Sequence, residues 1–152
     1  MDMLESSVFY KIIATVFFIG YFPIAPGTVA SAFAMIFIGL TKPSDTLIIY
    51  ILIISFFLGI LASKKVEEKA KKKDPSYIVI DEFAGYCTSV IFLPVNWYTL
   101  IACFVFFRFF DIIKPTPIRQ IERKLSGGIG IMMDDIIAGL ITNLLLRIFL
   151  IL

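Results

Sequence analysis

The chain has 152 residues, of which 59% are hydrophobic, and its mean hydropathy is +0.94. Soluble domains carry roughly 45–50% apolar residues, so this composition indicates an integral membrane protein. A net charge of +2 is too small to indicate a nucleic-acid-binding protein. Histidine is absent, which excludes Ser–His and Cys–His nucleophiles, phosphohistidine chemistry and most zinc sites. The two cysteines, Cys87 and Cys103, lie in apolar runs and are expected to be buried thiols.

Apolar runs are the candidate membrane spans. They cover residues 8–22, 29–40, 46–62, 77–93, 97–113 and 136–152. The run 46–62 is free of charge and proline, and at about 1.5 Å per residue it is long enough to cross a bilayer. The first two runs are short, so they can also form one broken hairpin or a re-entrant pair. Acidic residues near the N-terminus do not match a removable signal peptide.

Residues 20–31, GYFPIAPGTVAS, separate the first two runs. Proline stops a helix, Gly27 permits a tight turn, and Thr28 or Ser31 can cap the helix that follows. From the residues alone we favour a plain turn between helices. The alternative is a loop whose hydroxyl and backbone N–H groups receive a phosphate at a helix N-terminus.

Residues 64–74, KKVEEKAKKKD, form a strongly polar stretch with six lysines. The positive-inside rule predicts that this stretch is cytoplasmic. Alternating spans then bring residues 26–28 and the polar segment after Ile113 to the same side. We therefore expect the polar motifs to converge on one cytoplasmic face.

Two adjacent carboxylates, Asp81 and Glu82, lie inside an apolar run. Such a pair is costly to bury unless a cation neutralises it. One interpretation is an ion pair with Arg108 or Lys114. The other joins the pair with later aspartates as a site of oxygen ligands, which favours magnesium over zinc.

The segment 106–139 carries further charges among apolar residues. Arg108, Asp111 and Lys114 recur at a spacing that places them on one helix face, which the following proline disrupts. Asp134 and Asp135 stand at the start of an apolar run, where a carboxylate can cap a helix or hold a metal. A dication with a guanidinium and an ammonium group is typical of phosphoryl chemistry.

The blocks PGTVAS, IVIDEFAG and FFRFFDIIKPTPI…GGIGIMMDDIIAG resemble the signature blocks of the phosphatidylglycerophosphatase A family. They run from residue 26 to residue 139. The resemblance implies one all-α domain over residues 1–152, a multi-pass bundle of about four to six embedded helices. It also implies a magnesium-dependent enzyme of the bacterial cytoplasmic membrane. Such an enzyme removes the terminal phosphate of phosphatidylglycerophosphate and leaves phosphatidylglycerol.

Position by position, the resemblance carries acidic and basic functional positions onto this sequence, and the chemistry of the residues themselves adds the expected ligands of magnesium and phosphate. The expected catalytic residues are Asp81, Glu82, Arg108, Asp111, Lys114, Asp134 and Asp135. The expected magnesium ligands are Asp81, Glu82, Asp134 and Asp135. The expected phosphate-binding residues are Gly27, Thr28, Ser31, Arg108, Lys114, Gly127 and Gly128. Asp111 either orients Arg108 or joins the metal ligands, and the attacking group is either water or a carboxylate.

Three other classes of membrane protein share some of these features and differ in others. A small ion or phosphate carrier would distribute polar residues through the membrane depth. A CDP-alcohol phosphotransferase would need a D-G-x-x-A-R motif, which the sequence lacks. A noncatalytic membrane subunit would have no use for an acidic site with basic partners. Oligomeric state and acyl-chain preference are left open by the sequence.

Overall fold

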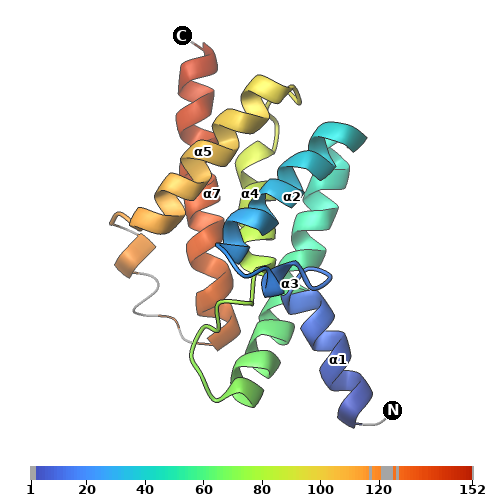
Figure 1. The fold of residues 1–152 in the computed structure, drawn as a ribbon. Helices are drawn as coiled ribbons and strands as arrows, with labels where there is room; N and C mark the ends of the chain where they lie inside the picture. Colours follow the sequence, from blue (N-terminus) through green and yellow to red (C-terminus); the bar gives the residue numbers. More distant parts are fainter. Residues whose placement is uncertain (1–2, 117, 121–124, 126, 152) are drawn as a thin grey trace.

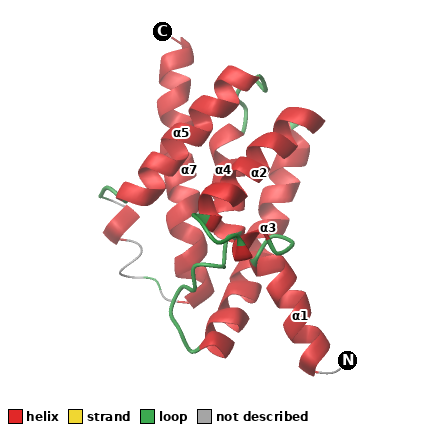
Figure 2. Ribbon diagram, in the orientation of Figure 1, coloured by secondary structure: helices red, strands yellow, loops and turns green. Residues whose placement is uncertain are grey.

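The computed structural model describes residues 3–116, 118–120, 125 and 127–151, and over these residues it is helical, with no strand (Figures 1 and 2). The all-α prediction is therefore confirmed. The elements are α1 (Met3–Ala14), the short 3-10 helix η1 (Ile19–Tyr21), α2 (Pro26–Thr41), α3 (Asp45–Ala70), α4 (Ile80–Val90), α5 (Trp97–Ile113) and α7 (Gly127–Ile151).

Helix α4 is the centre of the bundle. It packs against α7, α3, α2 and α5, and nine of its 11 residues are buried. The long helices α3 and α7 run alongside it, and α1 extends from the end of the bundle that lies opposite the C-terminus (Figure 1). Polar groups on the first turn of α4 are therefore surrounded by other helices.

Two glycines allow α4 and α7 to approach closely. A Cβ atom on Gly139 would lie 2.3 Å from the carbonyl oxygen of Gly85. A Cβ atom on Gly85 would lie 2.7 Å from the carbonyl oxygen of Asp135 and 2.7 Å from the ring of Phe107. No side chain fits in either place, so the backbones of α4 and α7 touch directly below the carboxylates.

The carbonyl groups at the C-terminal end of α4 accept hydrogen bonds from side chains of α7. The Asn143 amide donates hydrogen bonds to the carbonyl oxygens of Ser89 (3.0 Å) and Ile91 (2.9 Å). Arg147 also donates to the Ile91 oxygen (3.0 Å) and to the Asn143 side-chain oxygen (2.7 Å). The last carbonyls of a helix lack partners within the helix. These bonds let α4 end inside an apolar bundle, where an unpaired carbonyl would be costly.

Several helix boundaries differ from the predicted runs. Helix α5 matches the predicted run 97–113, and it ends before Pro115 with Lys114 in a left-handed conformation. The first run is not one helix, because α1 ends at Ala14 and residues 16–18 have positive φ angles of 46°, 53° and 70°. The prediction of one continuous helix over this run is therefore wrong, and the choice between a broken hairpin and a re-entrant pair stays a prediction. Helix α3 continues past residue 62 into the lysine-rich stretch.

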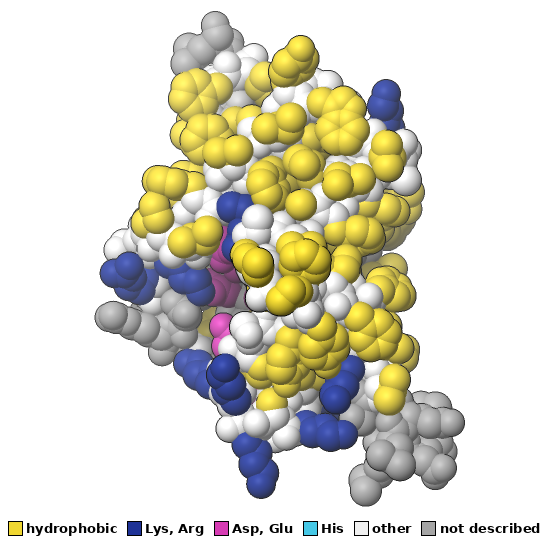
Figure 3. All heavy atoms as spheres, viewed as in Figure 1, with side chains coloured by type: hydrophobic (Ala, Val, Ile, Leu, Met, Phe, Trp, Pro, Cys, Tyr) yellow, Lys and Arg dark blue, Asp and Glu magenta, His cyan; other side chains and the backbone are white. Residues whose placement is uncertain are grey.

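Within the part of the chain that the structure describes, two helices are long and apolar enough to cross a membrane by length and composition, α3 and residues 127–150 of α7. Helix α2 is apolar but shorter. Exposed hydrophobic side chains also cover much of the face seen in Figure 3. These features indicate association with a membrane.

Candidate active site

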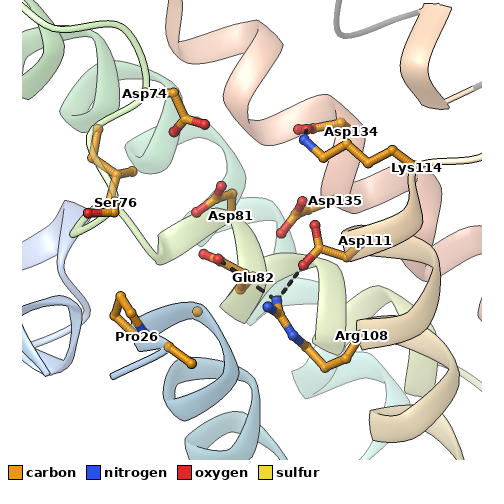
Figure 4. A pocket seen from close by; sticks show the side chains of 13 residues that line it. Pro26, Asp74, Ser76, Asp81, Glu82, Arg108, Asp111, Lys114, Asp134 and Asp135 are labelled. Carbon is orange, nitrogen blue, oxygen red and sulfur yellow. Dashed lines mark hydrogen bonds and ion pairs between the residues drawn. The ribbon is translucent and has the colours of Figure 1, made fainter. Parts of the chain in front are cut away.

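Residues from α2, α4, α5, α7 and the loop before α4 surround a mostly polar pocket of about 250 Å³ (Figure 4). In Figure 3 its acidic side chains lie in a hollow that is flanked by lysine and arginine. All seven predicted catalytic residues line the pocket. The complete wall is formed by Ala25, Pro26, Gly27, Asp74, Ser76, Ile78, Asp81, Glu82, Arg108, Asp111, Lys114, Asp134 and Asp135.

Three carboxylates form the centre of the site. Asp81 and Glu82 lie on the first turn of α4, and Asp135 faces them from α7 (Figure 4). One oxygen from each lies within 4.8 Å of the others. Asp81 is 8% exposed and Asp135 is 2% exposed. Each of the three residues has a buried oxygen without a hydrogen-bond partner.

This arrangement fits a hard divalent cation. Burying three close carboxylates is costly unless positive charge compensates them, because desolvation and mutual repulsion both oppose ionisation. Carboxylate oxygens without histidine or cysteine are the ligands that magnesium prefers. The oxygens without partners are the groups that such an ion would contact.

Arg108 and Asp111 form an ion pair beside these carboxylates. Arg108 Nη1 donates a hydrogen bond to Asp111 Oδ2 and lies 3.8 Å from Glu82 Oε1. Its Nε group is buried and has no hydrogen-bond partner. Asp111 therefore holds the guanidinium of Arg108 in place, and the Nε–H group of Arg108 stays available as a donor. Of the two alternatives for Asp111, the geometry favours orientation of Arg108.

Lys114 contacts Asp134 on the opposite side of the pocket. Lys114 Nζ donates to Asp134 Oδ2 at 2.5 Å. The close oxygen cluster comprises Asp81, Glu82 and Asp135, without Asp134. The predicted ligands Asp134 and Asp135, although adjacent in sequence, therefore have different surroundings.

The helix-capping interpretation of Asp134 and Asp135 was wrong. Helix α7 begins at Gly127, about two turns before Asp134, so both aspartates lie within the helix. Their carboxylates cannot cap its N-terminus. The glycine-rich segment 127–130 is the first turn of this helix.

The structure places only some of the predicted phosphate-binding residues at the pocket. Gly27 lines the pocket, and a Cβ atom there would lie 1.9 Å from Glu82 Oε1. Among the described residues the pocket wall does not include Thr28, Ser31, Gly127 or Gly128.

Two of these residues have structural contacts instead, Ser31 within its own helix and Gly128 with a neighbouring helix. Ser31 is fully buried and donates to the Gly27 carbonyl oxygen within α2, at 2.9 Å. It does not cap α2, whose N-cap residue is Ala25 and has no side-chain capping bond. Gly128 packs against α3, because a Cβ atom there would lie 2.0 Å from the Ile60 carbonyl oxygen.

Asp74 and Ser76 line the pocket but were not singled out by the sequence analysis. They lie in the loop between α3 and α4, where the backbone N–H of Asp74 donates to Glu67 Oε1 at 2.9 Å. The sequence signal was weak, because Asp74 ends a run of solvated charges. Its position ahead of a proline and close to Asp81 was the available hint.

Comparison with known proteins adds independent information. The sequence model of the family described as Phosphatidylglycerophosphatase A matches residues 12–150. A Bacteroides thetaiotaomicron protein, provisionally named a phosphatidylinositol-3-phosphatase, is 37% identical over 147 residues, which are 90% of this chain and 91% of that protein. Phosphatidylglycerophosphatase A of Escherichia coli is 36% identical over 135 residues, 88% of this chain and 78% of that protein.

A third relative is phosphatidylglycerophosphatase A of Haemophilus influenzae, 41% identical over 86 residues, which are 56% of this chain and 53% of that protein. No solved structure matches the chain. The family match covers nearly the whole chain, including every element that lines the pocket. The chain therefore belongs to the phosphatidylglycerophosphatase A family and is a phosphatase.

Proposed function

We propose that the protein hydrolyses the terminal phosphomonoester of phosphatidylglycerophosphate, giving phosphatidylglycerol and phosphate, with magnesium as cofactor. One observation carries the proposal: three carboxylates, two of them buried and one partly buried, are close enough to share a cation and stand beside an arginine with an unused buried donor. The names of the E. coli and H. influenzae relatives support this lipid as substrate. The name of the Bacteroides relative makes a phosphoinositide a second candidate.

The residues divide the chemistry between them. Asp81, Glu82 and Asp135 would hold magnesium, which supplies charge neutralisation and polarises the phosphoryl oxygens. Arg108 donates hydrogen bonds to the phosphate oxygens and counters the charge that develops on the transferring group. Asp111 keeps the guanidinium in position, and Asp134 does the same for the Lys114 ammonium.

An apolar layer near the site favours surface chemistry over transport. Gly85, one turn beyond Asp81, packs against Phe107. The rings of Phe107 and Tyr86 meet edge to face, with their centres 6.4 Å apart. Phe107, Tyr86 and Leu100 are each 0% exposed. A carrier needs a polar path through the bundle, whereas this packing separates the pocket from the opposite end.

We further propose a multi-pass orientation in a bacterial cytoplasmic membrane, with the pocket facing the cytoplasm. The lysine-rich end of α3 lies at the end of the bundle opposite the C-terminus (Figure 1), and the pocket-lining residue Lys114 follows the last residue of α5. The opposite end carries Trp97 and Tyr98, residues typical of a membrane interface. This arrangement agrees with the positive-inside rule.

The first prediction concerns Arg108. Arg108→Lys should lower kcat/KM about 30- to 1,000-fold, because a guanidinium contacts two phosphate oxygens and an ammonium acts as a point charge. The matched control is Arg119→Lys, since Arg119 is exposed and outside the pocket wall. Phosphate release from the purified proteins measures both. Equal activity of the two variants would remove Arg108 from the site.

The second prediction separates the adjacent aspartates by magnesium titration of phosphate release. Asp135→Asn should raise the magnesium concentration for half-maximal rate about tenfold or more, because it removes a ligand charge. Asp134→Asn should leave that concentration within about threefold and lower the maximal rate, because it weakens the hold on Lys114. Both phosphatidylglycerophosphate and phosphatidylinositol 3-phosphate are tested as substrates.

Three results of this titration would contradict the account. No release from either lipid by the parent would refute the proposed activity. An unshifted magnesium dependence in Asp135→Asn would refute the cation site. Equal shifts in both variants would return Asp134 to the ligand set.

The third prediction concerns orientation. In intact cells, Lys72→Cys should resist an impermeant thiol reagent, whereas Tyr98→Cys at the other end should react. The native cysteines, Cys87 and Cys103, are buried and give little background. Labelling of residue 72 from outside, with protection of residue 98, would reverse the proposed orientation.

A further inference from the structure

A second cavity lies on the other side of the first turn of α4. It is a groove of about 520 Å³ between α1, α2, α3 and α4. Its wall is apolar apart from one serine, and it consists of Phe9, Ile12, Ile13, Val16, Phe17, Phe33, Phe37, Ile51, Ile54, Ser55, Leu58, Ile80 and Phe83. The Ser55 hydroxyl already donates to the Leu52 carbonyl oxygen at 3.0 Å. Among the described side chains, the groove therefore offers no polar group that needs a partner.

The groove and the polar pocket share two helices. On α4, Ile80 and Phe83 line the groove, while the intervening Asp81 and Glu82 line the pocket. Helix α2 begins at the pocket and reaches the groove with Phe33 and Phe37, and Phe33 packs against Phe83 with ring centres 6.3 Å apart. One turn of α4 thus has a charged side and an apolar side.

The sizes of the two cavities suggest how they are used together. Sites that enclose a small molecule measure roughly 300–1,000 Å³ and are mostly apolar. The polar pocket, at about 250 Å³, has room for a phosphorylated headgroup, so the acyl chains of a lipid must lie outside it. The groove, at about 520 Å³, falls within that range and lies directly beside the headgroup site.

We propose that this groove holds an acyl chain of the lipid substrate while the headgroup phosphate occupies the polar pocket. This inference rests on the proposed function. A second copy of the chain is a poorer occupant, since two concave surfaces that meet face to face leave a void. The wall is also open to the surroundings, because Phe17 is 76% exposed and Ile54 is 58% exposed. A chain can therefore enter from the side without passing through the pocket.

The test uses two neighbouring residues of α3. Ile54 lines the groove, whereas Ile53 is exposed and lies outside its wall. Ile54→Trp should fill the groove, and Ile53→Trp adds the same side chain elsewhere on the surface. Leu58→Trp in the groove and Leu61→Trp outside it form a second matched pair, which is used if the first groove variant does not fold.

The measurement is kcat/KM for phosphatidylglycerophosphate with acyl chains of increasing length, in mixed micelles of fixed composition. For the parent, kcat/KM should rise with chain length until the groove is filled, by less than the roughly fourfold per methylene group that transfer from water would give, because the chain starts in the apolar micelle. Ile54→Trp should flatten this dependence, so that its loss of kcat/KM relative to the parent grows with chain length. Ile53→Trp should keep the parental slope. Equal slopes in the two variants would overturn the proposal.

A readout without catalysis separates this inference from the proposed function. A phospholipid with a photoactivatable acyl chain, in vesicles, should form adducts mainly with the groove wall in the parent and not in Ile54→Trp. Adducts spread evenly over the exposed apolar surface would refute the groove. Adducts in the groove of a parent that releases no phosphate from any lipid would refute the proposed activity and leave the groove supported.

Discussion

The contact between α4 and α7 at Gly85 and Gly139 is the constraint on which the site depends. Neither position has space for a Cβ atom, so the two backbones meet without intervening side chains. This contact brings the first turn of α4 beside the part of α7 that carries Asp135. A wider separation would draw the three carboxylates apart, and they could no longer share the proposed cation. The bonds from Asn143 and Arg147 hold the other end of α4 to the same helix.

Charge is balanced in pairs around this contact. Asp111 pairs with Arg108, and Asp134 pairs with Lys114, which leaves the negative charge of Asp81, Glu82 and Asp135 to be compensated. The 3.8 Å contact of Arg108 with Glu82 offsets part of that charge. A divalent cation would compensate two of these three negative charges. The apolar groove on the other side of α4 would then explain how a small polar pocket acts on a molecule that is mostly hydrocarbon.

Local patterns predicted much of this site. Helix α5 was predicted to its boundaries because a proline ends it, and the convergence of seven charged residues followed from their cost in apolar surroundings. The beginning of α7 was not predictable, because Gly127 and Gly128 have low helix propensity and contact with α3 stabilises the helix there. The separate surroundings of Asp134 and Asp135 depend on which way adjacent residues face across α7. The rotation of α7 about its own axis is set by its packing against α4 and α5. The spacing of residues in the sequence does not encode this packing.

Direct measurement of cation binding tests the central claim without reference to turnover. Manganese is a paramagnetic substitute for magnesium with the same preference for oxygen ligands. Titration of the purified protein with manganese, followed by electron paramagnetic resonance, should show binding that weakens about tenfold or more in Asp81→Asn, Glu82→Gln and Asp135→Asn. Thermal stability in detergent should stay near the parental value in each variant. Parental manganese affinity in all three variants would contradict the account, because the buried carboxylates would then have another role.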